Sequence, residues 1–233
     1  MILTKDMYVP ALRWRQGEYQ ALVRLAVAAK DRTVPYVTIP EVEYDFELRQ
    51  PKKMVHEHVH PFAARFAAKW GQRPAWVGVH PSISGQPMGD GRDIFTYVFE
   101  ALRAFQANAM PVVPLGASPP IVASVAAIVA TDGLGAAIAV RLEDLMKPDA
   151  RTRIETSAAS ISLSIDEVDL VIDLGAPNFE PYNAFAGALI AAMQKVGDLH
   201  GFRNFVLIST ATPETFKDVA KSLTRIGPAM CWR

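Results

Sequence analysis

The sequence predicts an α/β fold, a TIM-barrel-like repeat of seven strand–helix units in one domain over residues 1–233. Short apolar runs recur along the chain, each opened by a small or polar residue and ended by a charged or hydroxyl residue. A segment of helix length separates each run from the next, which is the periodicity of a parallel barrel. The clearest run covers residues 135–144, where glycine comes first and Arg141, Glu143 and Asp144 come last, as in a strand buried on both faces.

Seven strands follow from these runs, because each is rich in β-branched or other apolar residues and is bounded by turn formers. The first is followed by the charged triplet Arg13-Trp14-Arg15, and the fifth is the run that Gly135 opens. In chain order the predicted strands cover residues 7–12, 33–39, 75–79, 110–115, 135–140, 168–172 and 204–208.

The helices between these strands follow from amphipathic segments with recognisable start and stop residues. Pro61 suits the first position of the second helix, and Gly71 suits its C-terminal end. Ser118 is placed to cap the fourth helix, and Thr212 to cap the last one. In chain order the predicted helices cover residues 18–29, 61–70, 94–106, 119–131, 151–162, 182–200 and 213–226.

A closed barrel of this kind needs eight strand–helix units, and residues 227–233 are too few to form the eighth. We favour the interpretation that the chain is a short member of a longer family. Two alternatives stay open. A terminal segment such as residues 1–5 helps to close the barrel, or the sheet stays open and a partner chain or second copy covers its edges.

The composition narrows the classes of function. The 24 Lys and Arg residues balance the 24 Asp and Glu residues, so nucleic acid is not implied as a partner. The single cysteine, Cys231, excludes an internal disulfide framework and agrees with a reducing, cytoplasmic compartment. The longest apolar run of helical character, residues 121–130, is too short to span a bilayer, and the first ten residues lack the apolar core of a signal peptide.

The main functional signal is the set of polar residues that follow the predicted strands, because a barrel brings all strand exits to one rim. Catalytic roles are predicted for Glu41, His80 and Asp173, and ligand-binding roles for Arg13, Arg15, Arg141, Glu143 and Ser209.

Several arginines on one rim can hold a phosphate or a carboxylate, while a neighbouring acid or imidazole moves a proton. The sequence therefore predicts a site for a small anionic ligand, with phosphoester chemistry as the reaction class. The structural alternative is that Arg141 and Asp173, on neighbouring strands, only pair with each other to hold the mouth together.

We expect no chemical role for the other motifs of the sequence. His56, His58 and His60 invite a metal assignment, but the run leads into a helix, where residues two apart do not share a face. The hydroxyl-rich segment 209–212 fits a phosphate site, yet an ordinary N-cap at Thr212 is the favoured interpretation. No dinucleotide fingerprint, P-loop or nucleophile elbow occurs, so neither a cofactor nor a metal is predicted.

Residues 8–18, Tyr-Val-Pro-Ala-Leu-Arg-Trp-Arg-Gln-Gly-Glu, and residues 34–40, Val-Pro-Tyr-Val-Thr-Ile-Pro, resemble the phage beta-protein family of phage and bacterial genomes. Residues 70–74, 141–142 and 171–175 carry the same resemblance. It implies a βα-repeat fold, a phage or bacterial setting and a further C-terminal part, but no reaction. The family pattern leads us to expect an acidic residue where this chain has His80, which weakens a role carried over to that position.

The charged segment 42–58 is the longest irregular stretch between predicted elements, so it is a candidate lid or contact surface. It mixes Tyr44, Phe46, Leu48 and Met54 with basic side chains, a composition that suits an interface. The alternative function is therefore a non-catalytic interaction module in a phage or defence context, with a protein partner at this segment.

Overall fold

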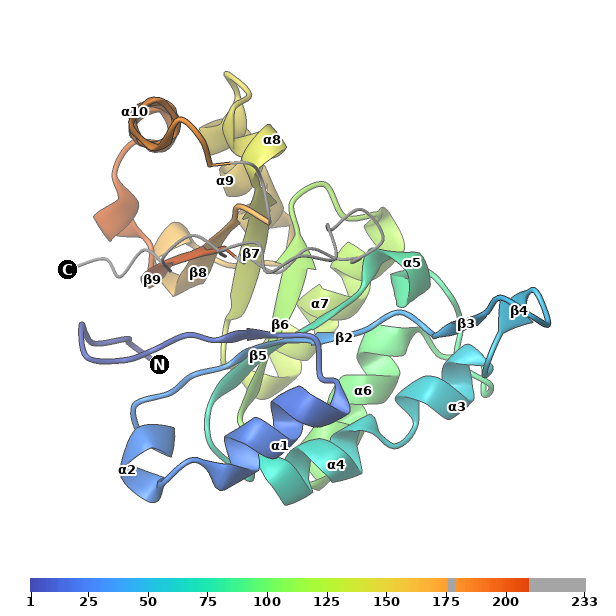
Figure 1. Cartoon of the computed structure of the whole chain (residues 1–233). Coiled ribbons are helices and arrows are strands. Elements are labelled where there is room, and N and C mark those ends of the chain that lie inside the picture. Colours follow the sequence, from blue (N-terminus) through green and yellow to red (C-terminus); the bar gives the residue numbers. More distant parts are fainter. Residues whose placement is uncertain (176–178, 210–233) are drawn as a thin grey trace.

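The computed structural model describes residues 1–175 and 179–209, and its main feature is a nearly closed, barrel-like parallel sheet flanked by helices (Figure 1). The seven strands of this sheet all run parallel and follow one another in chain order, which confirms the predicted architecture. They are β1 (Ala11–Leu12), β2 (Tyr36–Ile39), β5 (Ala75–Val79), β6 (Ala109–Pro114), β7 (Ala136–Arg141), β8 (Val168–Asp173) and β9 (Asn204–Ile208).

The helices connect these strands and cover the outer face of the sheet. They are α1 (Gln16–Arg24), α2 (Val27–Lys30), α3 (Val55–Val59), α4 (Phe62–Lys69), α5 (Pro81–Ser84), α6 (Ile94–Ala104), α7 (Pro119–Asp132), α8 (Leu142–Leu145), α9 (Ala150–Ser160) and α10 (Tyr182–Val196), with short 3-10 turns at Ile165–Glu167 and Leu199–Gly201. Among these described helices, none is both long enough and apolar enough to cross a bilayer.

Three predicted helix features differ from the structure. The predicted helix 18–29 breaks after α1, where Leu25 is extended and Lys30 Nζ donates to the carbonyl oxygen of Val23, 3.0 Å away. The predicted helix 182–200 ends at Val196, because Gly197 follows with a positive φ of 84°. Ser118 is the N-cap residue of α7, but its side chain makes no capping hydrogen bond. The predicted helix 213–226 and its cap, Thr212, lie outside the described residues.

Segment 42–58 has more regular structure than the sequence predicts. A small antiparallel hairpin, β3 (Tyr44–Asp45) with β4 (Gln50–Pro51), projects from the body of the protein (Figure 1). Asp45 Oδ1 accepts hydrogen bonds from the backbone N–H groups of Glu47 and Leu48, both at 2.9 Å, and so fixes the turn. The segment then enters α3 directly.

Alternation along the strands divides the core into two layers. Outward side chains such as Val77, Val113 and Ile138 are buried beneath the helices. Inward side chains, among them Trp76, Val112 and Val171, fill the interior of the barrel. The interior is therefore a packed core and not a pore, and only the ends of the strands are left to carry polar chemistry.

The N-terminal segment contributes to the interior at the bottom of the barrel, which is the end where the strands begin. The backbone N–H of Leu3 donates to Asn204 Oδ1 at 2.6 Å, and Asn204 Nδ2 donates to the carbonyl oxygen of Met1 at 3.0 Å. Met1 and Leu3 also pack against the interior cluster. Because Asn204 begins β9, these bonds bring the start of the chain to the strand opposite β1 in the sheet order, which supports the alternative that residues 1–5 help to close the barrel.

A buried carboxylate joins three strands at the same end of the barrel. Asp169 on β8 is 0% exposed and accepts from Trp76 Nε1 at 2.7 Å, from Asn204 Nδ2 at 2.6 Å and from the guanidinium of Arg203 at 2.6 and 2.8 Å. Gly135 allows this approach, since a Cβ there would lie 2.5 Å from Arg203 Nη1. These bonds tie β5, β8 and the start of β9 together across the interior.

The substitution Asp169→Asn removes the charge that Arg203 faces in a buried site. Breaking a buried ion pair by removing one partner costs about 3–5 kcal/mol, so we expect the free energy of unfolding to fall by that amount. Urea denaturation measures it, with Asp166→Asn as the control, because Asp166 is exposed on the neighbouring turn. A loss below about 1 kcal/mol, the value typical of surface pairs, would contradict the role assigned to Asp169.

Candidate functional site

Because side chains alternate along a strand, three of the predicted site residues point toward the axis of the barrel at its mouth, the end where the strands terminate. His80 continues the inward positions Trp76 and Gly78 of β5. Arg141 and Asp173 end β7 and β8 on the inward face, and their Cα atoms are partners in the register of the two strands. Because alternate residues of a strand point to the same side, these three side chains belong to one rim.

The buried side chain of Trp14 fixes the backbone between the two arginines that flank it, Arg13 and Arg15. Its indole is buried and packs against the rings of Phe62 and Phe66, with centroids 5.6 and 5.4 Å away. Trp14 has a φ of 47°, which is unfavourable for a non-glycine residue and persists only where packing enforces it. Burying the indole under α1 and α4 therefore fixes the path of the chain where it leaves β1.

Glu41 is the centre of a charged cluster at the ends of β1, β2 and β5. Arg15 Nη2 lies 2.7 Å from Glu41 Oε1, and His80 Nε2 lies 3.9 Å from Glu41 Oε2. Burial raises the pKa of Glu41, but its own backbone N–H and the charges of Arg15, His80 and Arg13 outweigh burial and leave the pKa below its ordinary value of 4.5. Glu41 is therefore a carboxylate at neutral pH, and it brings both arginines and His80 into one group.

The orientation of the His80 ring is set by contacts of Nδ1, the ring nitrogen that does not face Glu41. Its Nδ1 lies 2.8 Å from Ser82 Oγ and accepts from the backbone N–H of Ser82 at 3.3 Å. An accepting Nδ1 leaves the proton of a neutral imidazole on Nε2, the nitrogen that faces Glu41. The short helix α5 that begins at Pro81 therefore sets which nitrogen of His80 can exchange a proton at the mouth.

Tyr36 is a site residue that the sequence reasoning missed. It lies on β2 with its side chain among the interior residues, and burial, followed by the negative charge of Asp173, raises the pKa of its phenol, while Arg141 opposes this. The phenol therefore stays protonated and can donate a hydrogen bond. Its place on the inward face, in register with Trp76, was the signal that could have identified it.

Arg141 and Asp173 do not form the ion pair that the structural alternative required. Although they are register partners, no salt bridge joins them in the described part of the chain, and Asp173 Oδ1 instead accepts from the backbone N–H of Gly175 at 2.8 Å. The guanidinium of Arg141 is exposed, and residues 1–175 and 179–209 supply no hydrogen bond or ion pair to it. The alternative in which the two residues only hold the mouth together is thus wrong for this structure.

The structure does not place Glu143 and Ser209 with the inward rim residues or with the charged cluster around Glu41. Glu143 is exposed on α8, which begins immediately after Arg141. Ser209 is exposed directly after β9, and residues 210–212 of the predicted hydroxyl-rich segment lie outside the described residues. Both residues remain predictions for ligand binding, without a contact that supports them.

The three histidines of segment 56–60 serve as structural contacts. His56 and His60 share a face of α3 and stack with ring centroids 5.4 Å apart, while His58 Nε2 lies 2.9 Å from the carbonyl oxygen of Pro40 on another side. His56 Nδ1 accepts from the backbone N–H of Gly89 at 3.2 Å. Within the described ranges, no three His, Cys, Asp or Glu side chains are grouped to hold a metal ion.

Comparison with known proteins places the whole described barrel within one family. A family model described as Beta protein matches residues 8–229. A search of curated proteins found no significant match.

The lowered pKa of Glu41 predicts how the contribution of this residue to stability depends on pH. A carboxyl group with a depressed pKa in the folded state stabilises the protein above its unfolded pKa and loses this effect as the pH falls through the folded pKa. We expect Glu41→Gln to lower the free energy of unfolding by about 0.5–1 kcal/mol at pH 7, because the pair is partly exposed. Below the ordinary value of 4.5 the difference should shrink toward zero.

Urea denaturation of both proteins between pH 3 and pH 7 measures this dependence. Glu143→Gln is the matched control, since Glu143 is exposed and has no contact with the cluster. A Glu41→Gln effect that is constant over this range would show that the carboxylate charge does not hold the cluster together.

Proposed function

The chain belongs to the Beta protein family, and we propose that it binds a small anion, a phosphate or a carboxylate, at the mouth of its barrel. The observation that carries the proposal is the guanidinium of Arg141, which lies on the inward rim with no ion pair to the described residues. A guanidinium at the carboxyl end of a barrel strand that is paired with no carboxylate of the described ranges can bind a ligand, and Arg binds phosphate and carboxylate bidentately.

The other mouth residues have complementary roles in this proposal. The phenol of Tyr36 donates a hydrogen bond to an oxygen of the anion next to Arg141. Arg13 and Arg15 add positive charge on the opposite side of the mouth, where Arg15 is held by Glu41.

Proton transfer is the step that Glu41, His80 and Asp173 would supply if the bound anion reacts. Ser82 fixes the imidazole so that Nε2 points to the cluster, where Glu41 Oε2 lies 3.9 Å away. A phosphoester is the substrate class that fits, because an arginine-rich rim stabilises the negative charge on phosphoryl oxygens during its hydrolysis. The family name specifies no reaction, and a phage or bacterial setting and a cytoplasmic location are part of the same proposal.

Arg141→Gln should weaken binding of inorganic phosphate or of phosphoserine. A hydrogen bond to a charged group contributes about 1.5–3 kcal/mol, so the dissociation constant should rise by roughly tenfold to a hundredfold. Isothermal titration calorimetry measures the change. Arg73→Gln is the control, since Arg73 precedes β5 at the opposite end of the barrel and pairs with Asp31. Equal affinities for wild type and Arg141→Gln would remove Arg141 from the site.

A second candidate function, a protein-binding module, is favoured by the apolar tip of the β3–β4 hairpin. At this tip Phe46 is 85% exposed and Leu48 68%, and Tyr44 packs edge-on against Phe46 with centroids 5.2 Å apart. Met54, the residue that precedes α3, is 73% exposed. Exposed large apolar side chains that gather on a projecting element mark a surface for protein contacts. In this proposal the barrel is the scaffold and segment 42–58 is the contact surface, in a phage or defence context.

Replacing segment 42–58 with a short Gly/Ser linker tests the module, and the double substitution Phe46→Ser and Leu48→Ser tests its apolar tip. We expect both changes to abolish recovery of a specific host protein in a pull-down, because a few buried apolar anchors supply most of the binding energy of an interface. Lys52→Ser, which removes only the exposed pair with Glu43, should leave recovery unchanged. Unchanged recovery after the linker replacement would reject the segment as the interface.

A further inference from the structure

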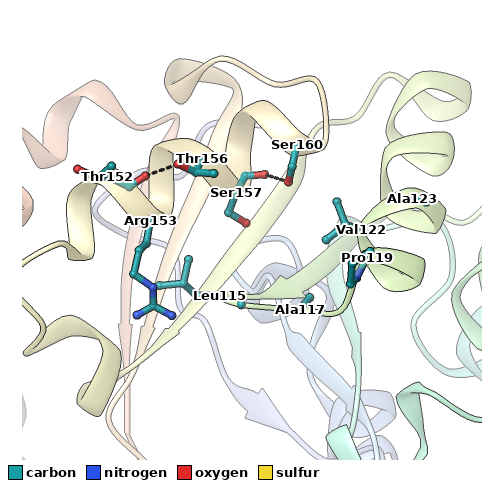
Figure 2. Close-up of a pocket in the computed structure, with 11 residues that line it drawn as sticks. Leu115, Ala117, Pro119, Val122, Ala123, Thr152, Arg153, Thr156, Ser157 and Ser160 are labelled. Carbon is teal, nitrogen blue, oxygen red and sulfur yellow. Dashed lines mark hydrogen bonds between the residues drawn. The ribbon is translucent and has the colours of Figure 1, made fainter.

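A cavity of about 590 Å³ lies between α7 and α9, outside the barrel (Figure 2). Its floor is the turn that follows β6, at residues 115–117. Cavities of roughly 300–1,000 Å³ are the usual size of small-molecule sites. None of its lining residues belongs to the mouth cluster, so the cavity is separate from the proposed anion site.

The two walls of this cavity differ in chemistry. The α7 wall is apolar and consists of Pro119, Val122 and Ala123 (Figure 2). The α9 wall is polar, because hydroxyl and guanidinium groups recur at spacings of three and four residues on one face of the helix. The residues of this wall are Thr152, Arg153, Thr156, Ser157 and Ser160.

Two groups on the polar wall have unused donors. Arg153 Nη1 donates to Asp144 Oδ1 at 2.7 Å, whereas its Nε and Nη2 make no hydrogen bond to the described residues. Ser157 is half-buried, and its hydroxyl likewise donates to no acceptor within the described ranges. Thr156 and Ser160, in contrast, donate to carbonyl oxygens of their own helix at 2.8 and 2.7 Å. The unused donors of Arg153 and Ser157 therefore lie one helical turn apart on the same wall.

The floor of the cavity leaves room for a group that binds Arg153. Gly116 has a φ of 81°, and a Cβ there would lie 3.5 Å from Arg153 Nη2, so a larger residue would fill the space beside the guanidinium. The nearby charge also favours an anion. Asp144 is shared between Arg153 and Lys147, whose Nζ lies 2.8 Å from Asp144 Oδ1, so two cations face one carboxylate.

We propose that this cavity binds a small organic anion whose carboxylate or sulfonate group lies on Arg153 and Ser157 and whose apolar body packs against the α7 wall. Charge-assisted hydrogen bonds to the guanidinium fix the head group. The body of the ligand is held by contact with Pro119, Val122 and Ala123, which gives the site its preference for an amphipathic molecule over inorganic phosphate.

The dye 8-anilinonaphthalene-1-sulfonate is the probe for this site, since it joins a sulfonate to an apolar body and fluoresces in apolar surroundings. We expect saturable fluorescence enhancement with the full chain. Arg153→Gln should raise the dissociation constant on the order of tenfold, and Arg153→Lys should restore part of the affinity. Arg151→Gln is the matched control, because Arg151 lies on the same helix but pairs with Glu155 away from the cavity.

Filling the cavity from its apolar wall gives an independent test. Ala123→Trp should abolish binding of the dye, whereas Ala127→Trp, one turn further along the exposed side of α7, should leave it unchanged. Arg141→Gln should also leave it unchanged, which separates this site from the barrel mouth. Absence of saturable binding to the wild type, or equal affinities for wild type, Arg153→Gln and Ala123→Trp, would overturn the proposal.

Discussion

The buried carboxylate of Asp169 is the interaction on which the shape of the barrel depends. It accepts four hydrogen bonds from side chains that come from β5, from the start of β9 and from the residue just before β9. A buried charge is stable only when it is paired and fully hydrogen-bonded, so these partners are held in place as firmly as the acid itself. Asn204 extends the same network to the backbone of Met1 and Leu3, and the beginning of the chain is thereby drawn against the last described strand.

The inward residues of β8 differ in role between the two ends of the barrel. Asp169 at the bottom is fully hydrogen-bonded, and Val171 in the middle packs within the apolar interior. Asp173 at the mouth accepts from the backbone N–H of Gly175 and has no other hydrogen-bond partner among the described residues. The apolar layer keeps the two acids apart, so the network around Asp169 fixes the strands without involving Asp173. On β7, two inward alanines likewise separate Arg141 from the bottom of the barrel. Arg141 forms no ion pair with the described residues.

The strand order and the positions of His80, Arg141 and Asp173 at the mouth could be predicted because apolar runs and their exits are local signals, and a parallel barrel brings all exits to one end. The network around Asp169 could not, since the acid lies within an apolar run and Trp76 is 93 residues away in the chain. Tyr36 was missed because it lies inside a strand, where only parity shows which face it occupies. The exposed position of Glu143 depends on where α8 begins, which the sequence pattern does not determine.

Following the arginine Nε–Hε resonances by NMR during titration with inorganic phosphate tests whether the mouth binds an anion. We expect a large, saturable shift for Arg141 and a smaller one for Arg15, which is already paired with Glu41. The resonances of Arg73 and Arg103, which pair with acids elsewhere on the surface, should stay unchanged. Small, linear shifts of all arginines without saturation, or an unchanged Arg141 resonance, would show that the mouth does not bind phosphate through Arg141.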